Sequence, residues 1–402
     1  MKGESLAFHF HRATPRGEGG VALFEIYGSG ALPAVKGAFR PRSGVLPEEG
    51  RARLADVVDP SGETVDEAVL ALVPAEAMWS RLPAWTACVH GGPWLEGRIQ
   101  SILSGLGGGA LDTAGVLRLS MSAGAMDALE AAAYECLIAA RTEKAARFFL
   151  RQHHGELSGR LREGIALADA GDVHGARSIL EGLLGAATPA YRLGHPLRVL
   201  LAGRPNAGKS TLFNRLLEEE RAVVSPTPGT TRDTLEETIA VDGFPIVIAD
   251  GAGIRPLEAA DPVEREGILR VHARDDDAVI HLVPYPWRIL DEDRAFLARR
   301  EPDRVLLLGS FADLAPPDEE ARVDLRVSAL AGSGLPALRR AIVERWIDAR
   351  DPPGQEVPAA PFTRRQRRVL DRASPLPGSG RGPPLLDEVR GAYIECLRNS
   401  WP

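Results

Sequence analysis

The apolar and polar positions of residues 6–110 form short alternating runs separated by turn-forming residues. Alternation with a period of two is typical of strands that are buried on one face. The pattern predicts strands at residues 6–11, 21–27, 65–73 and 86–90, and a helix at residues 95–106. We therefore expect an α+β domain over residues 1–112.

Residues 121–187 follow a different pattern, with apolar side chains at three- and four-residue spacing in a sequence rich in Ala, Leu, Glu and Arg. This spacing predicts amphipathic helices, so we expect the first part of a helical domain over residues 113–196. One predicted core stripe consists of Leu129, Ala132, Ala133, Cys136, Leu137 and Ala140. His153 and His154 are expected on a polar helix surface.

A third pattern begins at Leu197, where a wholly apolar run is followed by a glycine-containing turn and a helical stretch. Such a run is typical of a parallel strand that is buried on both faces. Further buried strands, predicted at residues 246–249, 278–283, 305–308 and 325–327, indicate an α/β domain over residues 197–350. A proline-rich linker and renewed helical composition occupy residues 351–402. We expect this last segment to pack on the helices of residues 121–187, which makes the α/β domain an insertion in a helical domain.

The composition restricts the number of domains and the kinds of partner that we expect. The chain has 402 residues, of which 44% are hydrophobic and 26% charged, and its formal net charge is −7. This length predicts two or three domains, and this balance is that of an ordinary soluble globular protein. The negative charge argues against a protein that coats nucleic acid along its whole surface, and we expect no DNA partner. The basic cluster at residues 364–368 is interpreted as a solvated helix face.

The cysteines Cys88, Cys136 and Cys396 lie far apart, so their spacing predicts neither a zinc site nor a disulfide framework. The first ten residues lack the apolar run of a signal peptide, and no window reaches the apolar length of a membrane span. We expect a cytoplasmic protein without a membrane partner.

A phosphate-binding motif follows the strand that begins at Leu197. Gly203-Arg-Pro-Asn-Ala-Gly208-Lys209-Ser210 fits GxxxxGK[ST] at every fixed position, between a buried strand and a helix. Glycines are needed because backbone N–H groups must wrap a phosphate. Lys209 is expected to neutralise the β and γ oxygens, and the Ser210 hydroxyl to hold Mg²⁺. The expected phosphate contacts are Gly203, Asn206, Ala207, Gly208, Lys209, Ser210 and Thr211.

Two downstream segments have the features of nucleotide-sensing switches. Asp250 follows a buried strand, and we expect it to face Mg²⁺ while the Gly253 amide faces the γ-phosphate. The earlier polar segment Pro228-Gly229-Thr230-Thr231-Arg232-Asp233 offers threonines that can reach the phosphates and, through Thr231, Mg²⁺. We interpret it as a loop that is ordered by GTP and released on hydrolysis.

The water-positioning glutamine of Ras-like proteins is missing, because Gly253 is followed by Ile254. The charge on the transferring phosphoryl group still needs a cation, for which Arg232 and Arg255 are candidates. Glu264 is the nearest plausible carboxylate that could position the attacking water.

A base-reading aspartate is expected after a later strand, since a carboxylate accepts both N–H groups of the guanine edge. Asp313 follows the strand at residues 305–308, but Ser310 and Phe311 stand where an Asn-Lys pair would complete the element. Ser328 and Ala329 are placed to complete the base pocket. We expect binding of GTP and GDP with weakened guanine selectivity, and relaxation toward ATP is an alternative.

These residues together resemble the tRNA-modification GTPase family called MnmE or TrmE. The resemblance rests on the phosphate loop and its continuation to Asn214, on Pro-Gly-Thr-Thr-Arg-Asp233, and on Val263-Glu264-Arg265. It extends to the N-terminal domain through residues 13–20, 56–59, 65–67 and 90–93. It implies a multidomain α/β and α+β fold, with a P-loop GTPase domain inserted in a helical domain and an α+β domain before it.

The resemblance also implies a mechanism and partners. The G domains would dimerise across their switch faces, with K⁺ ligated by Asn206, water oriented by the catalytic Glu264, and a homodimer formed through the N-terminal domain. The family modifies the wobble uridine of tRNA, using a folate one-carbon donor and a flavoprotein partner. By resemblance, this chain is a K⁺-stimulated GTPase of that reaction.

Some family positions are changed in this sequence. The residues at the family's folate contacts are Glu25 in place of Arg, Leu82 in place of Glu, and Ala125 in place of Lys. Because Glu25 would repel the carboxylates of folate, we expect folate binding to be absent or very weak. The family's C-terminal Cys-x-Gly-Lys is not found, and Cys396 lies in a different context. A guanine-nucleotide-binding scaffold or regulator without one-carbon transfer is therefore the alternative function.

Overall fold

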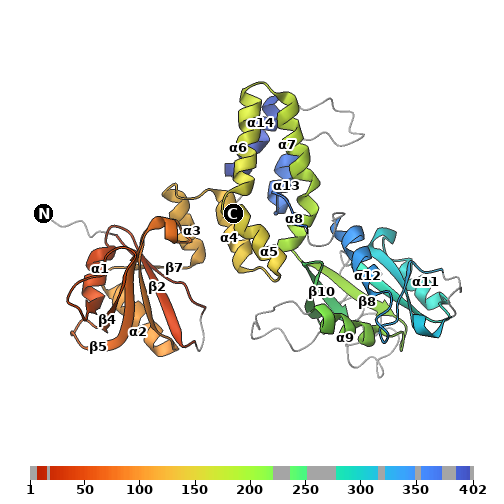
Figure 1. Ribbon diagram of the computed structural model, residues 1–402, viewed down its shortest axis with the longest axis horizontal. Helices are drawn as coiled ribbons and strands as arrows, with labels where there is room; N and C mark the ends of the chain where they lie inside the picture. Colours follow the sequence, from red (N-terminus) through yellow and green to blue (C-terminus); the bar gives the residue numbers. More distant parts are fainter. Residues whose placement is uncertain are drawn as a thin grey trace. The chain divides into compact units, whose positions relative to one another are not determined.

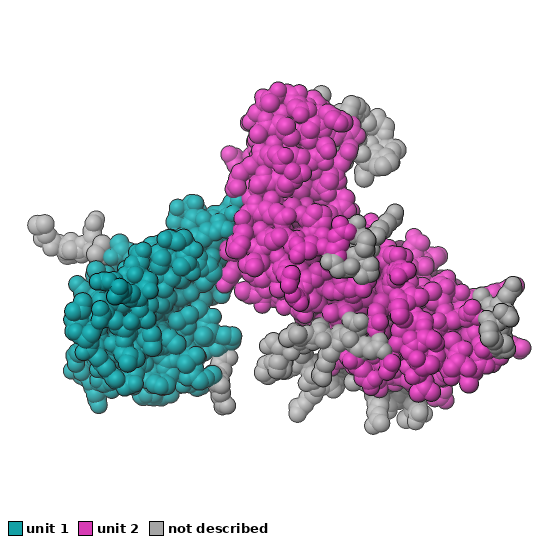
Figure 2. All heavy atoms as spheres, viewed as in Figure 1, with its two compact units in different colours: residues 1–131 teal, residues 132–402 magenta. Residues whose placement is uncertain are grey.

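The computed structural model describes residues 7–15, 19–220, 236–250, 278–315, 322–348, 355–373 and 386–398. The chain divides into two compact units, Met1–Ala131 and Ala132–Pro402, which Figure 2 shows in different colours. Within the described ranges, no helix has the length and apolar character needed to cross a membrane.

Unit 1 is built on a seven-stranded sheet with the order β3-β4-β5-β6-β2-β1-β7 (Figure 1). Neighbouring strands are antiparallel except for β1 and β7, which are parallel. The strands are β1 His9–Arg12, β2 Val21–Tyr27, β3 Phe39–Pro41, β4 Ala52–Val58, β5 Thr64–Val73, β6 Ala84–His90 and β7 Gly109–Leu111. The four strands predicted from alternation correspond to β1, β2, β5 and β6, whereas β3, β4 and β7 were not predicted.

The helices of unit 1 are α1 Ala31–Ala38, α2 Pro93–Gly105 and α3 Thr113–Ser122, with a short 3₁₀ turn η1 at Ala75–Ala77. α2 begins at a proline, whose missing N–H is not needed in the first turn of a helix. Its Ile99 and Leu103 join Phe24, Ile26 and Leu70 in one buried core. Burying each of these side chains contributes about 1.5–3 kcal/mol, and this core holds the sheet and helices together.

α4 Ala128–Ile138 spans the boundary between the two units. The further helices of the helical part of unit 2 are α5 Glu143–His153, α6 Glu156–Asp169, α7 Val173–Gly185, α8 Ala187–Gly194, α13 Arg364–Asp371 and α14 Leu386–Arg398. α5 starts at Thr142, whose side chain accepts a hydrogen bond from the Ala145 N–H at 3.3 Å. His154 is exposed as expected, but the prediction for His153 was wrong. His153 is buried beside Tyr134, with ring centroids 5.2 Å apart, because it lies on the inward face of α5.

α14 packs against α6 and α7, although the whole α/β part separates them in the sequence (Figure 1). The buried Tyr393 hydroxyl donates a hydrogen bond to the Ala176 carbonyl at 2.6 Å. The Tyr393 ring lies so close to Gly164 that a Cβ there would be 2.4 Å from it. Arg390 forms an ion pair with Asp169. Helices from before and after the α/β part thus share one core.

The α/β part contains a six-stranded sheet with the order β13-β12-β11-β8-β10-β9. All neighbours are parallel except β9, which is antiparallel to β10. The strands are β8 Leu197–Gly203, β9 Glu236–Val241, β10 Phe244–Asp250, β11 Ala278–Pro284, β12 Val305–Ser310 and β13 Leu325–Arg326. The buried strands predicted from apolar runs are confirmed as β8, β10, β11 and β12. The strand predicted at residues 325–327 is only the two-residue β13, which is not buried, and β9 was not predicted.

The described helices of this part are α9 Lys209–Glu220, α11 Asp291–Leu297 and α12 Leu335–Ile342. α12 continues into the π-helical turn η4 Val343–Ile347. Every residue of β11 before Pro284 is buried, and β8 is nearly as enclosed, because the parallel sheet is covered on both faces.

Candidate functional site

The phosphate loop joins β8 to α9 at the centre of the parallel sheet. β8 lies between β10 and β11, and the carboxyl ends of these three strands meet at one edge. Connections leave the sheet in different directions at this point, where open α/β sheets bind their ligands. The position of the motif in the fold therefore agrees with a phosphate site.

Gly203 lies where no side chain fits. Its φ of +136° lies in the region that favours glycine, and a Cβ would lie 2.5 Å from the Leu282 carbonyl oxygen of β11. Further along the loop, Asn206 has φ 61° and Gly208 φ 89°. These angles let the chain curl back on itself and turn backbone N–H groups toward one point.

The side chains of the loop divide into a buried and an exposed group. Ala207 and Lys209 are buried, and Asn206, Ser210 and Thr211 are exposed. Lys209 Nζ donates hydrogen bonds to the carbonyls of Gly203 at 2.9 Å and Arg204 at 2.8 Å. The ammonium group is therefore held inside the loop, at the position from which it can neutralise phosphate oxygens.

Ser310 ties the end of β12 to the phosphate loop. Its buried hydroxyl donates to the Ala207 carbonyl at 2.7 Å, and its own carbonyl accepts from Trp287 Nε1 at 2.9 Å. Phe311 follows with φ 58°, and its ring lies 3.5 Å from the position of a Cβ on Gly208. Ser310 is thus a brace for the loop, and Phe311 packs on the loop itself.

The residues expected at the base lie on two adjoining loops. The Ala312 N–H donates to the Val327 carbonyl at 3.1 Å, which joins the turn containing Asp313 to the end of β13. Asp313 is exposed, and Ser328 is buried with its hydroxyl accepting from the Ala331 N–H at 3.1 Å. The structure therefore brings Asp313 near the segment Ser328–Ala329, with the Asp313 carboxylate open to a ligand.

A buried ionic cluster beneath the loop was not predicted from the sequence. His281 Nε2 and Asp293 Oδ1 are 2.9 Å apart, and Arg204 Nε lies 3.3 Å from Asp293 Oδ2. Burial lowers the pKa of His281, although the hydrogen bond to Asp293 opposes this shift. The sequence did contain one sign of this cluster, which is the single histidine inside the apolar strand β11. A buried histidine requires a hydrogen-bond partner, so its position indicates that a polar residue lies nearby.

The switch residues fall mostly outside the described part of the chain. Asp250 ends β10 in register with Leu201 of β8, so its backbone lies at the edge that carries the phosphate loop. The other predicted switch and catalytic residues, Thr230, Thr231, Arg232, Gly253, Arg255 and Glu264, lie outside the described residues.

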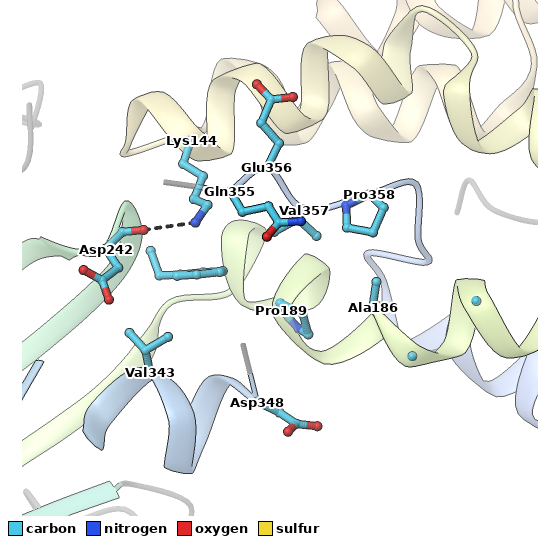
Figure 3. A pocket seen from close by; sticks show the side chains of 13 residues that line it. Lys144, Ala186, Pro189, Asp242, Val343, Asp348, Gln355, Glu356, Val357 and Pro358 are labelled. Atoms are coloured by element: carbon cyan, nitrogen blue, oxygen red, sulfur yellow. Dashed lines mark hydrogen bonds between the residues drawn. The ribbon is translucent and has the colours of Figure 1, made fainter. Parts of the chain in front are cut away.

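The β9–β10 hairpin connects the two switch segments and contacts α5. Its turn, Asp242–Gly243, has φ of 49° and 81°, as two-residue hairpin turns require. Lys144 Nζ donates to the Asp242 carbonyl at 3.1 Å and lies 4.5 Å from the centre of the Phe244 ring (Figure 3). Arg141 donates to the buried Thr238 hydroxyl at 2.9 Å. The hairpin is therefore docked on the helical part.

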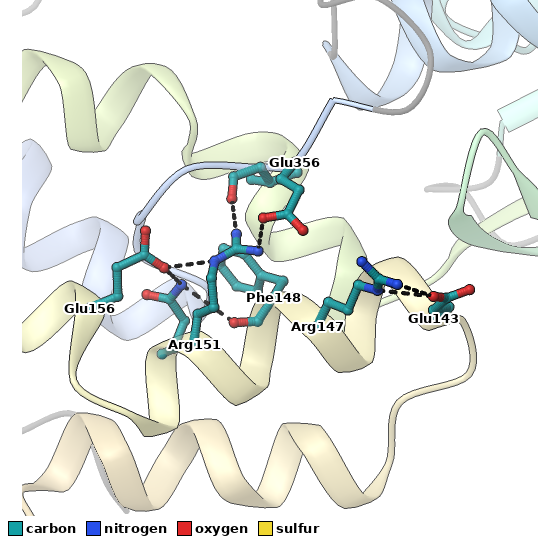
Figure 4. A network of polar contacts seen from close by, with 8 residues as sticks. Glu143, Arg147, Phe148, Arg151, Glu156 and Glu356 are labelled. Atoms are coloured by element: carbon teal, nitrogen blue, oxygen red, sulfur yellow. Dashed lines mark hydrogen bonds and ion pairs between the residues drawn. The ribbon is translucent and has the colours of Figure 1, made fainter.

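The linker after the α/β part contacts the same helix. Arg151 of α5 bridges Glu156 and Glu356 and also donates to the Val357 carbonyl at 2.6 Å (Figure 4). A cleft of about 250 Å³ separates the hairpin from α7, α8 and this linker. Both the hairpin and the linker thus meet α5 close to where the α/β part joins the helices.

A phosphate loop with its lysine, at the carboxyl edge of a parallel sheet, defines the α/β part as a P-loop nucleotide-binding domain. The family model described as "50S ribosome-binding GTPase" matches residues 198–308, so the class is that of the P-loop GTPases.

Full-length relatives are more specific. The tRNA modification GTPase MnmE of Alkalilimnicola ehrlichii is 35% identical over 357 residues, which cover 81% of this chain and 79% of that protein. An MnmE of Thermus thermophilus is 32% identical over 396 residues, covering 90% of this chain and 86% of that protein. The chain belongs to the tRNA modification GTPase MnmE family, and it is an enzyme that binds and hydrolyses GTP.

Two of the positions that the resemblance assigns to folate contacts hold a buried carboxylate and an apolar side chain. Glu25 is buried, and its carboxylate shares hydrogen bonds with His11 Nδ1 at 2.9 Å, Tyr27 Oη at 2.6 Å and Trp79 Nε1 at 2.9 Å. Leu82 belongs to an apolar cluster that includes Tyr27. The donors available here are already used by a carboxylate of the protein itself.

Proposed function

We propose that this chain acts as the GTP-driven switch of a tRNA-modification reaction at the wobble uridine. The observation that carries the proposal is the phosphate loop, in which Lys209 is already held at the ligand position by two carbonyls. The names of the relatives supply the tRNA and its modification.

We further propose that Ser210, Asp250 and Thr231 hold Mg²⁺ and that Asn206 holds K⁺. The exposure of Ser210 and Asn206 beside the loop supports these roles, as does the register of Asp250 with Leu201. Bound cations would neutralise the charge that develops on the phosphoryl group. Glu264 is proposed to orient water and Arg232 to stabilise charge, with Thr230 and Gly253 beside the γ-phosphate.

The domain arrangement is part of the proposal. The α/β part is proposed to be an insertion in a helical domain, which is supported by the Tyr393 bond to Ala176 and by the Arg151 bridge to Glu356. Residues 1–112 are proposed to form the homodimer, and a flavoprotein is proposed as the partner in modification. GTP-driven dimerisation of the α/β parts would then move the helices through the hairpin on α5.

The Glu25 network favours a second candidate function. A chain that cannot place a cation at this position gains nothing from the carboxylates of folate. In this alternative the protein is a guanine-nucleotide-dependent scaffold or regulator, and another component supplies the one-carbon unit.

Nucleotide binding and cation dependence test the switch. Purified protein is titrated with GTP, GDP and ATP, and GTP hydrolysis is compared in KCl and NaCl. We expect GTP and GDP to bind more tightly than ATP and hydrolysis to be faster in K⁺. Equal rates of GTP hydrolysis in KCl and NaCl would contradict a K⁺-dependent closure of the α/β parts.

The Lys209→Ala variant tests the site itself. We expect the Kd for GTP to rise at least about 100-fold, because a desolvated charge contact to phosphate is lost. Circular dichroism should show that the chain still folds. Tight binding by this variant would show that the site is elsewhere.

Folate binding separates the two candidate functions. Titration with 5-formyltetrahydrofolate, followed by calorimetry, is expected to show no binding in the micromolar range. Micromolar binding would contradict our interpretation of Glu25 and Leu82 and would remove the argument for the scaffold.

A further inference from the structure

An arginine patch covers the face shared by α8 and α13. It consists of Arg192, Arg364, Arg365, Arg367 and Arg368, together with the aromatic residues Tyr191 and His195. We propose that this arginine patch binds the phosphate backbone of RNA. The inference rests on the proposed function, because tRNA is the RNA that the names of the relatives indicate.

The fold of α13 turns its arginines outward. The helix starts at a capping box formed by Thr363 and Gln366. Gln366, Val369 and Leu370 are buried, whereas the four arginines of the helix are exposed. The inward side chains fix the rotation of the helix, and the cations are consequently presented to solvent.

Two contacts join α13 to α8 and build the patch from distant parts of the chain. Arg364 Nε donates to the Tyr191 hydroxyl at 2.9 Å, and Arg367 Nη1 donates to the Thr188 hydroxyl at 3.1 Å. Arg364 and Arg367 therefore have a structural role. Within the described residues, Arg365 and Arg368 have no hydrogen-bond or ion-pair partner.

Arg365 and Arg368 differ from the exposed arginines of other helices, because the described residues place no carboxylate beside them. On α5, α6 and α7 the exposed arginines Arg147, Arg160 and Arg177 each pair with a glutamate three or four residues away. In the patch, the ion pair given by the described residues is Arg367 with Asp371 at 3.5 Å. Positive charge is therefore concentrated here, in a chain whose net charge is −7.

The aromatic pair favours RNA over an acidic protein as the partner. The Tyr191 and His195 rings are stacked, with centroids 4.2 Å apart and planes 8° apart. The guanidinium carbons of Arg364 and Arg192 lie 5.6 and 5.9 Å from the centre of the Tyr191 ring. Flat rings and guanidinium planes among cations suit a strand of phosphates and unstacked bases.

The electrostatic field of the patch also acts on His195. Burial lowers the pKa of His195, and the neighbouring Arg364 and Arg192 lower it further. The stacked histidine contributes a flat ring to the patch.

The salt dependence of tRNA binding tests the proposal. The full chain is titrated into labelled tRNA at several KCl concentrations, and fluorescence anisotropy gives Kd at each. For R365A/R368A we expect Kd to rise about tenfold near 100 mM salt. The slope of log Kd against log salt should fall by about 1.5, because two phosphate contacts are lost.

The matched control is R40A/R340A, which also removes two exposed arginines without partners among the described residues. The control should keep the affinity and slope of the unmodified protein. GTP binding and hydrolysis should be unchanged in both double variants. These measurements therefore distinguish a failure of the proposed GTPase function from a failure of the RNA-binding proposal. Equal tRNA affinity and equal slope in patch and control variants, or no tRNA binding by a chain that hydrolyses GTP, would overturn the proposal.

Discussion

Ser310 shows how a residue that departs from a motif can still serve the site. A serine at this position lacks the amide of the expected asparagine, yet its hydroxyl reaches the Ala207 carbonyl of the phosphate loop. The loop is therefore braced from β12 as well as by Lys209. The shape of the nucleotide site therefore depends on buried bonds from both residues.

Replacing Ser310 by alanine should weaken nucleotide binding as well as stability. The Ala207 carbonyl loses its buried donor, which costs about 1–3 kcal/mol. We expect a lower Tm and a several-fold higher Kd for GDP. The control is Ser120→Ala, which removes a buried hydroxyl that donates to the Val116 carbonyl within α3. An unchanged Kd in Ser310→Ala would contradict the brace.

The buried His281 predicts a pH dependence of stability. Its pKa is lowered in the folded chain, so the unfolded chain binds a proton below about pH 6.5 that the folded chain does not. The contribution of neutral His281 to the free energy of unfolding is fully present above about pH 6.5. It is lost as the pH falls toward the lowered pKa of His281. In His281→Gln, urea unfolding between pH 7.5 and 5.5 should lose less stability than in the unmodified protein. An equal loss of unfolding free energy in both proteins would contradict the role of His281 in this pH dependence.

Single residues were predictable where a local motif defines them. The phosphate loop, from Gly203 to Ser210, is contiguous, so its spacing alone carries the chemistry. Glu25 and Trp79 lie on different elements, and so do His281 and Asp293. Their pairing depends on strand register and packing, which a pattern of single residues does not contain. The Glu25 substitution was visible in the sequence, but its three partners were not.

At the scale of elements, the β9–β10 hairpin joins the α/β sheet to α5 through Lys144. A Cβ on Gly243 would lie 2.9 Å from both Cβ and Cδ of Lys144. This contact occurs at the root of the lysine side chain, where little adjustment is available.

Gly243→Ala should therefore lower the free energy of unfolding by more than the strain of a left-handed backbone alone would. The matched control is Gly62→Ala, since Gly62 has φ +87° and open space around it, against φ +81° for Gly243. Both variants incur about 1–2 kcal/mol for the left-handed backbone. We expect Gly243→Ala to lose at least about 1 kcal/mol more in urea unfolding, because Lys144 must move. Equal losses would show that the hairpin is not held by this contact.

Elements buried on both faces were predictable from apolar runs, as β8, β11 and β12 show. The missed strands β4 and β9 carry polar and charged residues among their apolar ones. Such short mixed segments resemble loops until their sheet partners are known. The same reasoning explains His153, because its burial depends on packing against other elements, including Tyr134 of α4.

For the whole molecule, α14 links the end of the described chain to α6 and α7. We expect Tyr393→Phe to cost about 1–2 kcal/mol, because the Ala176 carbonyl loses its donor. Hydrogen exchange should accelerate in α6 and α7, which lie far from Tyr393 in sequence. Tyr27→Phe removes a buried hydroxyl from unit 1 and should leave that exchange unchanged. Equal exchange in Tyr393→Phe would show that this bond does not stabilise the two helices.

The carboxylate at Glu25 determines which charge this part of unit 1 can accommodate. Its donors come from three separate segments, β1, β2 and the stretch after η1. An arginine at this position would place a donor-only cation against the donor-only indole N–H of Trp79 and would remove the carboxylate that accepts from it. A cation could therefore be accommodated in this part of unit 1 only if the surrounding donors were changed together with Glu25.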